Sequence, residues 1–193
     1  SSAAYFAPLG WRIFCFEPDP ENRLHLVKRF GDHPRVSIDV RAVSDKPAAS
    51  ASFFKSPEST GISGLHAFRD SHDAAGAVEV TTIAEILDLR GLDHVDFLKI
   101  DVEGFDLSVL RGVPWNRLRP DVIEAEFEDA KTLRLGHSWR DLCEYLAVRG
   151  YSVYLSEWNP IVRYGVRHDW RRLYRFGDST PDPDGWGNVI AFK

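Results

Sequence analysis

The stretch VDFLKIDVEGFDLSVLRGV, residues 95–113, decides the fold of this chain. An apolar run over residues 93–101 stops at an acid, which is typical of a short buried strand. After a glycine turn, Leu107 and Leu110 follow at helical spacing, so a helix is expected over residues 105–111. The order of strand, turn and helix predicts one repeat of an α/β fold.

The same alternation of strands and helices extends on both sides of this segment. Short apolar strands that alternate with helices indicate a mostly parallel sheet covered on both faces, and such sheets bind ligands at the carboxyl ends of their strands. The segment SPESTGISG, residues 56–64, is rich in Ser and Gly and is predicted to be a loop. Further strands are expected at residues 11–17, 36–43, 51–54, 78–81, 120–128, 151–155 and 188–192, and further helices at 20–30, 83–89 and 138–149.

Length and composition exclude several classes of protein. A chain of 193 residues with 44% apolar residues is expected to form a single domain that needs no disulfide or structural metal. The 24 basic and 29 acidic side chains give a net charge of -5, which argues against a nucleic-acid partner. No run of about 18 apolar residues is present, so no membrane span is expected. Cys15 and Cys143 fit no metal or redox spacing, which favours buried thiols and a cytoplasmic setting.

Glu17 is the first candidate site residue, because it ends an expected strand. A carboxylate in this position can accept hydrogen bonds from both hydroxyls of an adenosine ribose. The alternative is an acid that faces the N-terminus of the helix expected to open at Pro20. The residue alone leaves both interpretations open.

Asp101 and Glu103 follow the strand that contains Lys99. A lysine inside an apolar strand is costly unless its charge reaches water or a partner. Asp101 could hold a cationic group of a cofactor or orient a substrate hydroxyl, and Gly104 permits a backbone conformation that other residues disfavour. The alternative is that one of the two acids caps the next helix.

Glu126 lies in an alternating stretch in which Glu124 and Glu128 share its face of the expected strand. In a covered sheet Glu126 would be partnered or would lie at the mouth of a site. An exposed strand end is the competing interpretation.

At this point the sequence resembles the FkbM-type methyltransferases, whose members carry a very similar "LKIDVEG…LRG" segment. Residues 99–104 are the most specific part of the resemblance. It extends to IFCFEPDPEN, RAVSD, VTTIAEIL, GYSVY and GNVIAF at residues 13–22, 41–45, 80–87, 150–154 and 187–192.

The resemblance implies a class I methyltransferase that uses S-adenosyl-L-methionine and usually methylates a hydroxyl oxygen. It implies a Rossmann-like sheet of seven strands, mostly parallel, with an antiparallel last strand. Glu17, with Pro18 beside it, would hold the adenosine ribose, and Asp101 would face the methionine end or the reacting centre. The residues implied to flank the adenine are Ala42, Val43 and Ser44.

The resemblance departs from the family at the front of the chain. Family members begin with a strand and a Gly-rich turn of the "DVGAN.G" kind, and this sequence starts beyond that turn. It also contains no methionine. We therefore expect the single domain over residues 1–193 to lack the first strand and the cofactor loop of the family.

Methyl transfer to an alcohol needs a base near the acceptor oxygen. The candidates for this catalytic role are Asp101, Glu103, Glu126 and His168, and none has a spacing that singles it out. No metal is expected, because the histidines show no spacing typical of metal ligands. A metal-assisted reaction is the alternative, since related methyltransferases hold Mg²⁺ with carboxylates.

The segment RYGVRHDWRRLYR, residues 163–175, carries five arginines and one acid with aromatic residues between them. Such a mixture can bind phosphate or carboxylate groups and stack on rings, so it is predicted to bind the acceptor. The acceptor would be a small molecule, a glycan, a lipid-linked or a secondary-metabolite hydroxyl compound, with an acidic one favoured by the arginines. The alternative is a solvated segment that packs its aromatic rings inward. The residues predicted to bind the acceptor are Arg163, Arg167, Trp170, Arg171 and Arg172.

Two other functions compete with methyl transfer. One is an inactive Rossmann-like domain that serves as a binding or assembly module. The other is a nicotinamide-dependent dehydrogenase, since Glu17 would suit the ribose of that cofactor as well.

Overall fold

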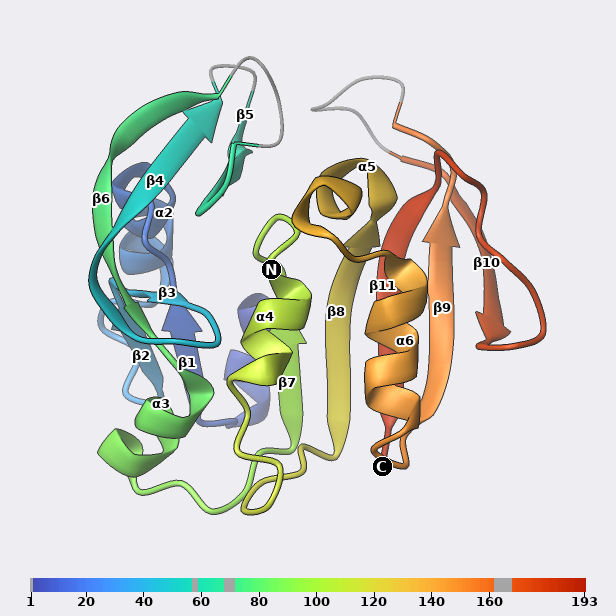
Figure 1. The fold of residues 1–193 in the computed structure, drawn as a ribbon. Coiled ribbons are helices and arrows are strands. Elements are labelled where there is room, and N and C mark those ends of the chain that lie inside the picture. The colour runs from blue at the N-terminus through green and yellow to red at the C-terminus, as the bar shows by residue number, and fades with distance from the viewer. Residues whose placement is uncertain (1, 57–58, 68–71, 162–167) are drawn as a thin grey trace. The chain divides into compact units, whose positions relative to one another are not determined.

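The computed structural model describes residues 2–56, 59–67, 72–161 and 168–193. These residues form both helices and strands, and the two kinds of element alternate between residues 83 and 158, so the expected α/β class is confirmed (Figure 1). The chain divides into two compact units, Ser1–Thr82 and Ile83–Lys193. Among the described helices, none combines the length and the apolar character that crossing a membrane requires.

The first unit contains two small sheets. β1 and β2 form a parallel pair in which Ile13 lies opposite Val36. The second sheet has the order β3-β6-β4-β5, in which only the β3–β6 pair is parallel. The elements of this unit are α1 (Ser2–Phe6), η1 (Ala7–Leu9), β1 (Ile13–Phe16), α2 (Pro20–Phe30), β2 (Val36–Asp39), β3 (Ala42–Val43), β4 (Ala48–Ser56), β5 (Ser59–Gly64) and β6 (Asp73–Thr81).

Two expectations for the first unit are wrong. The predicted loop at residues 56–64 contains β5, because pairing with β4 places Phe54 opposite Gly64 and satisfies a backbone whose residues have little strand propensity of their own. The single strand expected at residues 36–43 is two strands in different sheets. The chain turns between them where Asp39 Oδ1 accepts a hydrogen bond from the Arg41 backbone N–H at 3.1 Å.

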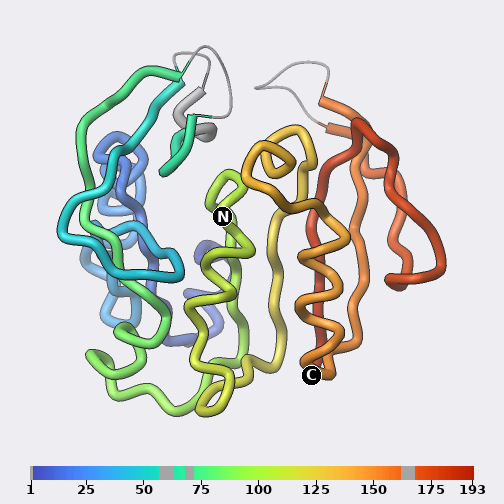
Figure 2. Tube along the Cα trace, viewed as in Figure 1, coloured from blue at the N-terminus to red at the C-terminus, as the bar shows by residue number. Residues whose placement is uncertain are grey.

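The second unit is built on one five-stranded sheet with the order β10-β9-β11-β8-β7. β7 and β8 are parallel, and the remaining neighbours are antiparallel. β11 runs between β8 and β9, which confirms the expected antiparallel final pair of strands (Figure 2). The elements are α3 (Ile83–Arg90), β7 (Phe97–Ile100), α4 (Asp106–Arg111), β8 (Val122–Glu128), α5 (Asp129–Thr132), η2 (Leu133–Leu135), α6 (Trp139–Ala147), β9 (Ser152–Trp158), β10 (Trp170–Arg175) and β11 (Trp186–Phe192).

Helices α4 and α6 cover one face of this sheet (Figure 1). β8 alternates between buried and half-buried side chains, and Ile123, Ala125 and Phe127 point into the core beneath these helices. Leu110 and Leu146 are fully buried on the helix side. The three glutamates of β8 therefore lie on the opposite face.

The arrangement of sheets differs from the expected one. The described residues form separate sheets of two, five and four strands, and two of these sheets are mixed or largely antiparallel, where one mostly parallel sheet was predicted. The parallel pairs are β1–β2, β3–β6 and β7–β8.

Candidate functional site

Three of the predicted catalytic residues meet at the carboxyl ends of β7 and β8. Ile100 lies opposite Ala125, so the next residues of the two parallel strands, Asp101 and Glu126, follow at the same edge. One carboxylate oxygen from each of Asp101, Glu103 and Glu126 lies within 4.8 Å of the other two.

Lys131 of α5 lies at the centre of these carboxylates, and the sequence did not predict it. Its Nζ lies 2.7 Å from Glu103 Oε2 and 2.9 Å from both Glu126 Oε2 and Glu128 Oε2. Only 4% of its side chain is exposed. We call Lys131 and these three glutamates the Lys131 cluster. One signal could have revealed it, because glutamates on one face of a covered strand require a nearby cation.

The turn between β7 and α4 is shaped by this cluster. Glu103 has a φ of 54°, a conformation that residues other than glycine rarely adopt, and its ion pair with Lys131 holds it there. Gly104 follows with a φ of 95°, and a Cβ at that position would lie 3.4 Å from Lys131 Cβ. The N-cap of α4 is Phe105, with no capping side chain, so the alternative capping role of Asp101 or Glu103 is not the one seen.

Asp106, the first residue of α4, is a further carboxyl group behind the cluster. It is buried, with 2% of its surface exposed. Its Oδ1 accepts a hydrogen bond from the Glu126 backbone N–H at 2.9 Å, while Oδ2 has no hydrogen-bond partner. Its charged form is therefore poorly compensated.

Burial and mutual repulsion shift the titration of this region. Burial, opposed by Lys131 and reinforced by Glu126 and Asp101, raises the pKa of Glu103 to about 8. Burial, together with the charges of Glu126 and Asp101, raises the pKa of Asp106 to about 7. Burial also raises the pKa of Glu126. Burial lowers the pKa of Lys131, but the carboxylates around it outweigh burial, and the pKa is higher than usual.

Lys99 supplies a second cation at the same edge. Its Nζ lies 2.9 Å from Glu124 Oε1 and 3.4 Å from Asp101 Oδ2. Burial lowers the pKa of Lys99, but these two carboxylates outweigh burial and raise it overall. The charge of Lys99, whose burial in an apolar strand would be unfavourable, is thus compensated by two carboxylates. About half of the Asp101 side chain remains exposed.

In the first unit, the carboxyl end of β1 places Glu17 at the start of α2. Asp19 caps this helix by accepting hydrogen bonds from the backbone N–H groups of Glu21 and Asn22 at 2.7 and 3.4 Å. Glu17 Oε1 in turn accepts a hydrogen bond from the Asp19 backbone N–H at 2.9 Å. Arg23 donates to the backbone oxygens of Glu17 and Pro18 at 3.1 Å each. The predicted ribose-binding carboxylate therefore lies on a well-fixed turn.

The residues implied to flank the adenine lie in and just after β3. Ala42 and Val43 are buried and pair with Val80 and Thr81. Ser44 is also buried, and its hydroxyl donates to Asp45 Oδ1 at 3.2 Å. Their role in binding a cofactor remains a prediction.

Comparison with known proteins adds a family to this geometry. Residues 1–153 match the family described as the methyltransferase FkbM domain. The chain belongs to this family. No curated protein sequence matches the chain. A crystal structure of methyltransferase FkbM from Methylobacillus flagellatus KT is similar to it, with a TM-score of 0.48 and 16% sequence identity over 94% of this chain and 36% of that one. The chain thus spans about a third of the length of that protein.

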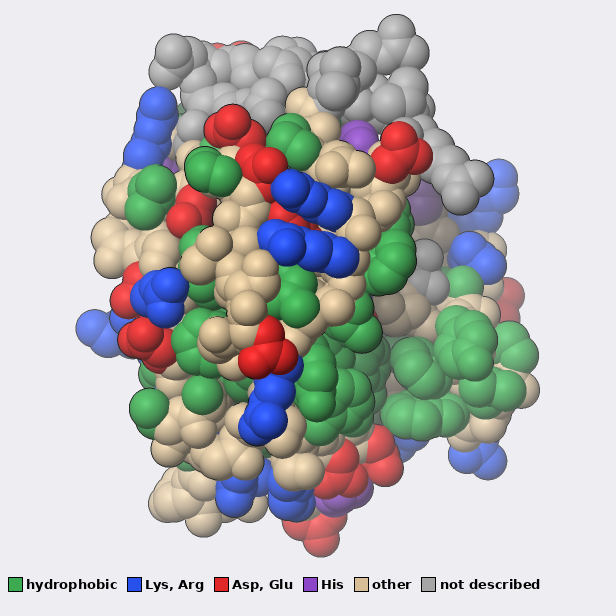
Figure 3. All heavy atoms as spheres, turned by 90° about the vertical axis from the view of Figure 1, so that its right-hand side faces the viewer, with side chains coloured by type: hydrophobic (Ala, Val, Ile, Leu, Met, Phe, Trp, Pro, Cys, Tyr) green, Lys and Arg blue, Asp and Glu red, His purple; other side chains and the backbone are tan. Residues whose placement is uncertain are grey.

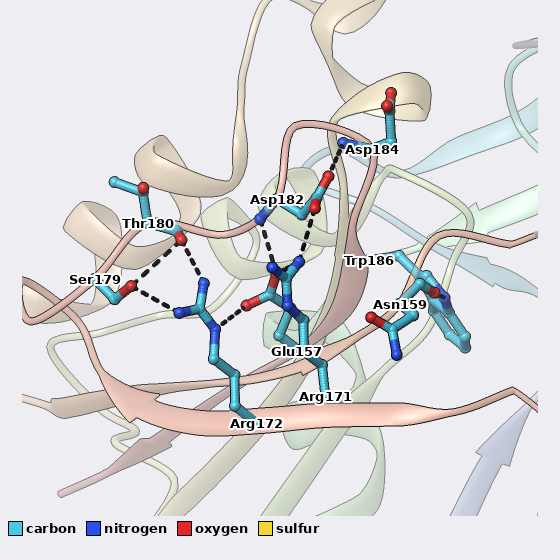
Figure 4. A network of polar contacts seen from close by, with 9 residues as sticks. All are labelled: Glu157, Asn159, Arg171, Arg172, Ser179, Thr180, Asp182, Asp184 and Trp186. Carbon is cyan, nitrogen blue, oxygen red and sulfur yellow. Dashed lines mark hydrogen bonds and ion pairs between the residues drawn. The ribbon is translucent and has the colours of Figure 1, made fainter.

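In this FkbM domain, two of the arginines predicted to bind the acceptor, Arg171 and Arg172, have partners within the chain (Figure 4). Arg171 Nη1 lies 3.2 Å from Glu157 Oε1 and 2.7 Å from Asp182 Oδ2. Arg172 Nε lies 2.7 Å from Glu157 Oε2, and its Nη groups donate to Ser179 Oγ and the Thr180 backbone oxygen at 3.1 and 2.7 Å. We call this group the Glu157 network. Arg163 and Arg167 lie outside the described residues.

The other two predicted residues of this segment lie beside tryptophans. The His168 ring meets the Trp186 ring edge-on, with centroids 5.3 Å apart. Trp170 is 53% exposed at the start of β10. His168 is therefore placed against an aromatic ring, whereas the other three catalytic candidates meet one another.

Among the residues that the structure describes, two groups of side chains have a geometry that could hold a cation. In the first, Asp101, Glu103 and Glu126, the Lys131 ammonium already neutralises part of the charge. The second consists of His94, Asp96 and Asp121 and lies near the amino ends of β7 and β8.

Proposed function

We propose that the domain is an S-adenosyl-L-methionine-dependent methyltransferase that methylates a hydroxyl oxygen. The observation that carries this proposal is the edge where Asp101 adjoins the Lys131 cluster, within a chain of the FkbM family. The carboxylates of each unit support this proposal by their chemistry. Carboxylates such as Glu17 can accept hydrogen bonds from ribose hydroxyls, and an excess of carboxylates favours a cationic sulfonium.

In the proposed mechanism, the proton of the acceptor hydroxyl leaves at the carboxyl ends of β7 and β8. The bound cofactor would supply a methyl carbon whose bond to sulfur breaks as the acceptor oxygen bonds to it, the electron pair remaining on sulfur. Asp101, with about half of its side chain exposed, accepts the proton of the hydroxyl. Lys131 holds Glu103 and Glu126 behind it.

The same charges favour a neutral acceptor. An anionic acceptor would meet Asp101 and the Lys131 cluster, whose three glutamates outnumber its one lysine. Two of the arginines that suggested an acidic acceptor, Arg171 and Arg172, already contact Glu157 and Asp182. We therefore replace the acidic acceptor with a neutral hydroxyl compound.

The architecture of a class I methyltransferase is part of the proposal. The parallel pairs β1–β2 and β7–β8 and the antiparallel insertion of β11 are elements that such a Rossmann-like sheet contains. Each of the two parallel pairs places an acid, Glu17 or Asp101, just after one of its strands.

The test is the variant Asp101→Ala in the full protein that contains this domain. S-adenosylhomocysteine formation is followed with a panel of neutral methyl glycosides as acceptors, and calorimetry measures cofactor binding. We expect Asp101→Ala to abolish turnover. Asp96→Ala, at the opposite end of the same strand, is the matched control and should turn over normally. Full turnover by Asp101→Ala would refute the role of this residue. Absence of cofactor binding to the unaltered protein would instead favour a binding or assembly module.

A further inference from the structure

Three tryptophans lie in one row across the sheet of the second unit. In the register of the strands, Glu128 of β8 lies opposite Trp186 of β11, which lies opposite Trp158 of β9, which lies opposite Trp170 of β10. Half of the six tryptophans of the chain are therefore in one row that ends at the Lys131 cluster.

The row lies on the sheet face opposite α4 and α6. Along β9 and β11 the buried residues, among them Leu155 and Val189, alternate with half-buried ones that include Trp158 and Trp186. Side chains of a strand alternate between the faces, so both tryptophans share the face of Glu128. Hydrophobic side chains also gather on the side of the molecule that carries β10 (Figure 3).

Contacts at their edges hold the indoles in place. The rings of Trp158 and Trp186 are stacked, with centroids 5.9 Å apart and planes 25° apart. Trp186 Nε1 donates to the Asn159 backbone oxygen at 3.1 Å, a contact drawn in Figure 4. Trp170 Nε1 donates to Ser156 Oγ at 3.2 Å. The N–H groups of both outer indoles are thus satisfied, and what Trp170 offers to solvent, at 53% exposure, is largely apolar ring surface.

A polar row runs beside the aromatic one. On the same face, two residues away from the aromatic row along each strand, Glu126 lies opposite Asn188, and Asn188 lies opposite Ser156. These side chains can exchange hydrogen bonds with hydroxyl groups. Flat aromatic surface bordered by amide, hydroxyl and carboxylate groups suits a ligand with one apolar face and a polar rim. The C–H face and the hydroxyl rim of a pyranose ring have this character.

We propose that Trp158, Trp170 and Trp186 form a stacking platform for a neutral sugar ring of the methyl acceptor. The inference rests on the proposed function and names the substrate class of that site. Neighbouring strands lie about 4.8 Å apart, so a ring over Trp186 is one strand away from Glu128. A ring stacked there directs its hydroxyls toward the carboxylates at the end of β8.

The experiment measures binding of the same neutral methyl glycosides to the full protein by saturation-transfer NMR and titration. We expect Trp170→Ala and Trp186→Ala each to weaken binding about two- to tenfold, the usual contribution of a stacked aromatic ring. Trp170→Phe, which keeps a ring, should bind within about twofold of the unaltered protein. Trp139→Ala is the matched control, because Trp139 lies at the start of α6 and contacts Phe176.

Three results would overturn the proposal. They are equal affinity in Trp170→Ala, Trp186→Ala and Trp139→Ala, the absence of any glycoside binding, and preferential binding of benzyl alcohol, which would indicate an aromatic acceptor. Calorimetric titration of S-adenosylhomocysteine into the same variants separates this failure from that of the proposed function. Cofactor binding that persists while glycoside binding is absent refutes the platform alone.

Discussion

The Lys131 cluster and the Glu157 network each surround one buried ion, but their charges balance differently. Lys131 faces three carboxylates, with the buried Asp106 behind them. Glu157, which is fully buried, faces two guanidinium groups, and one of these also pairs with Asp182. The first region has an excess of acids, whereas the second is neutral as a whole.

This difference separates a cluster whose buried acids have raised pKa values from a network whose charges are balanced. In the Glu157 network every charge has an opposite partner and the guanidinium groups are over a third exposed, so the network ties β9 and β10 to the segment before β11. In the Lys131 cluster, burial reinforced by neighbouring acids raises the pKa of Glu103 to about 8, and behind the cluster the same causes raise the pKa of Asp106 to about 7. Groups that titrate near neutral pH can exchange protons with a substrate.

The largest expected effect is that of Lys131→Met. It leaves buried carboxylates without their cation, so the free energy of unfolding should fall by about 3–5 kcal/mol at pH 8. The loss should be smaller at pH 5.5, where Glu103 and Glu126 are more readily protonated. Denaturant titrations at the two pH values measure both effects.

Lys193→Met is the matched control for this variant. Lys193 lies 3.3 Å from Asp121 with both side chains nearly half exposed, and the change should alter stability by less than about 0.5 kcal/mol. A Lys131→Met protein as stable as this control would show that the cluster is not held together by its lysine.

Asp106→Asn should stabilise the protein at high pH. The pKa of Asp106 is raised from 3.8 to about 7, so its contribution to stability is fully present below pH 4 and is lost as the pH rises through 7. The asparagine stays neutral, and its carbonyl can still accept from the Glu126 N–H. The free energy gained over the unaltered protein should be about 3 kcal/mol larger at pH 9 than at pH 5. A gain that does not change with pH would mean that Asp106 ionises normally.

Glu157→Gln should have the smallest effect of the three. Glutamine has the same size, and its one amide oxygen can still accept a hydrogen bond from one of the two arginines, while both arginines keep their contacts to Asp182 and Thr180. We expect a loss of about 1 kcal/mol, equal at pH 5.5 and 8, and unchanged cofactor binding. Thermal unfolding at both pH values tests this. A pH-dependent loss would remove the distinction between the two regions.

Local patterns predicted the elements that build the site. The apolar run before Asp101 became β7, the capping signals at Asp19 and Pro20 became the start of α2, and the alternation in β8 set its two faces. These features depend on residues close together in the sequence. They could therefore be predicted without knowledge of the tertiary contacts.

The features that were missed depend on distant contacts. Lys131 contacts Glu103, which lies 28 positions before it, and no local pattern connects them. β5 is a strand because it pairs with β4. The partners of Arg171 come from Glu157 and Asp182, on either side of it in the sequence, and a count of charges cannot assign them. Pairing of this kind follows from the topology of the sheet.

The place of β11 has a consequence for the order in which the second unit assembles during synthesis. β8 and β9 have no backbone pairing with each other, and residues 186–192 hydrogen-bond to both. The ribosome produces those residues after the other strands of the sheet. The carboxylates of β8 and the tryptophan of β9 therefore become neighbours in one sheet only once this later segment has been synthesised and has paired with both strands.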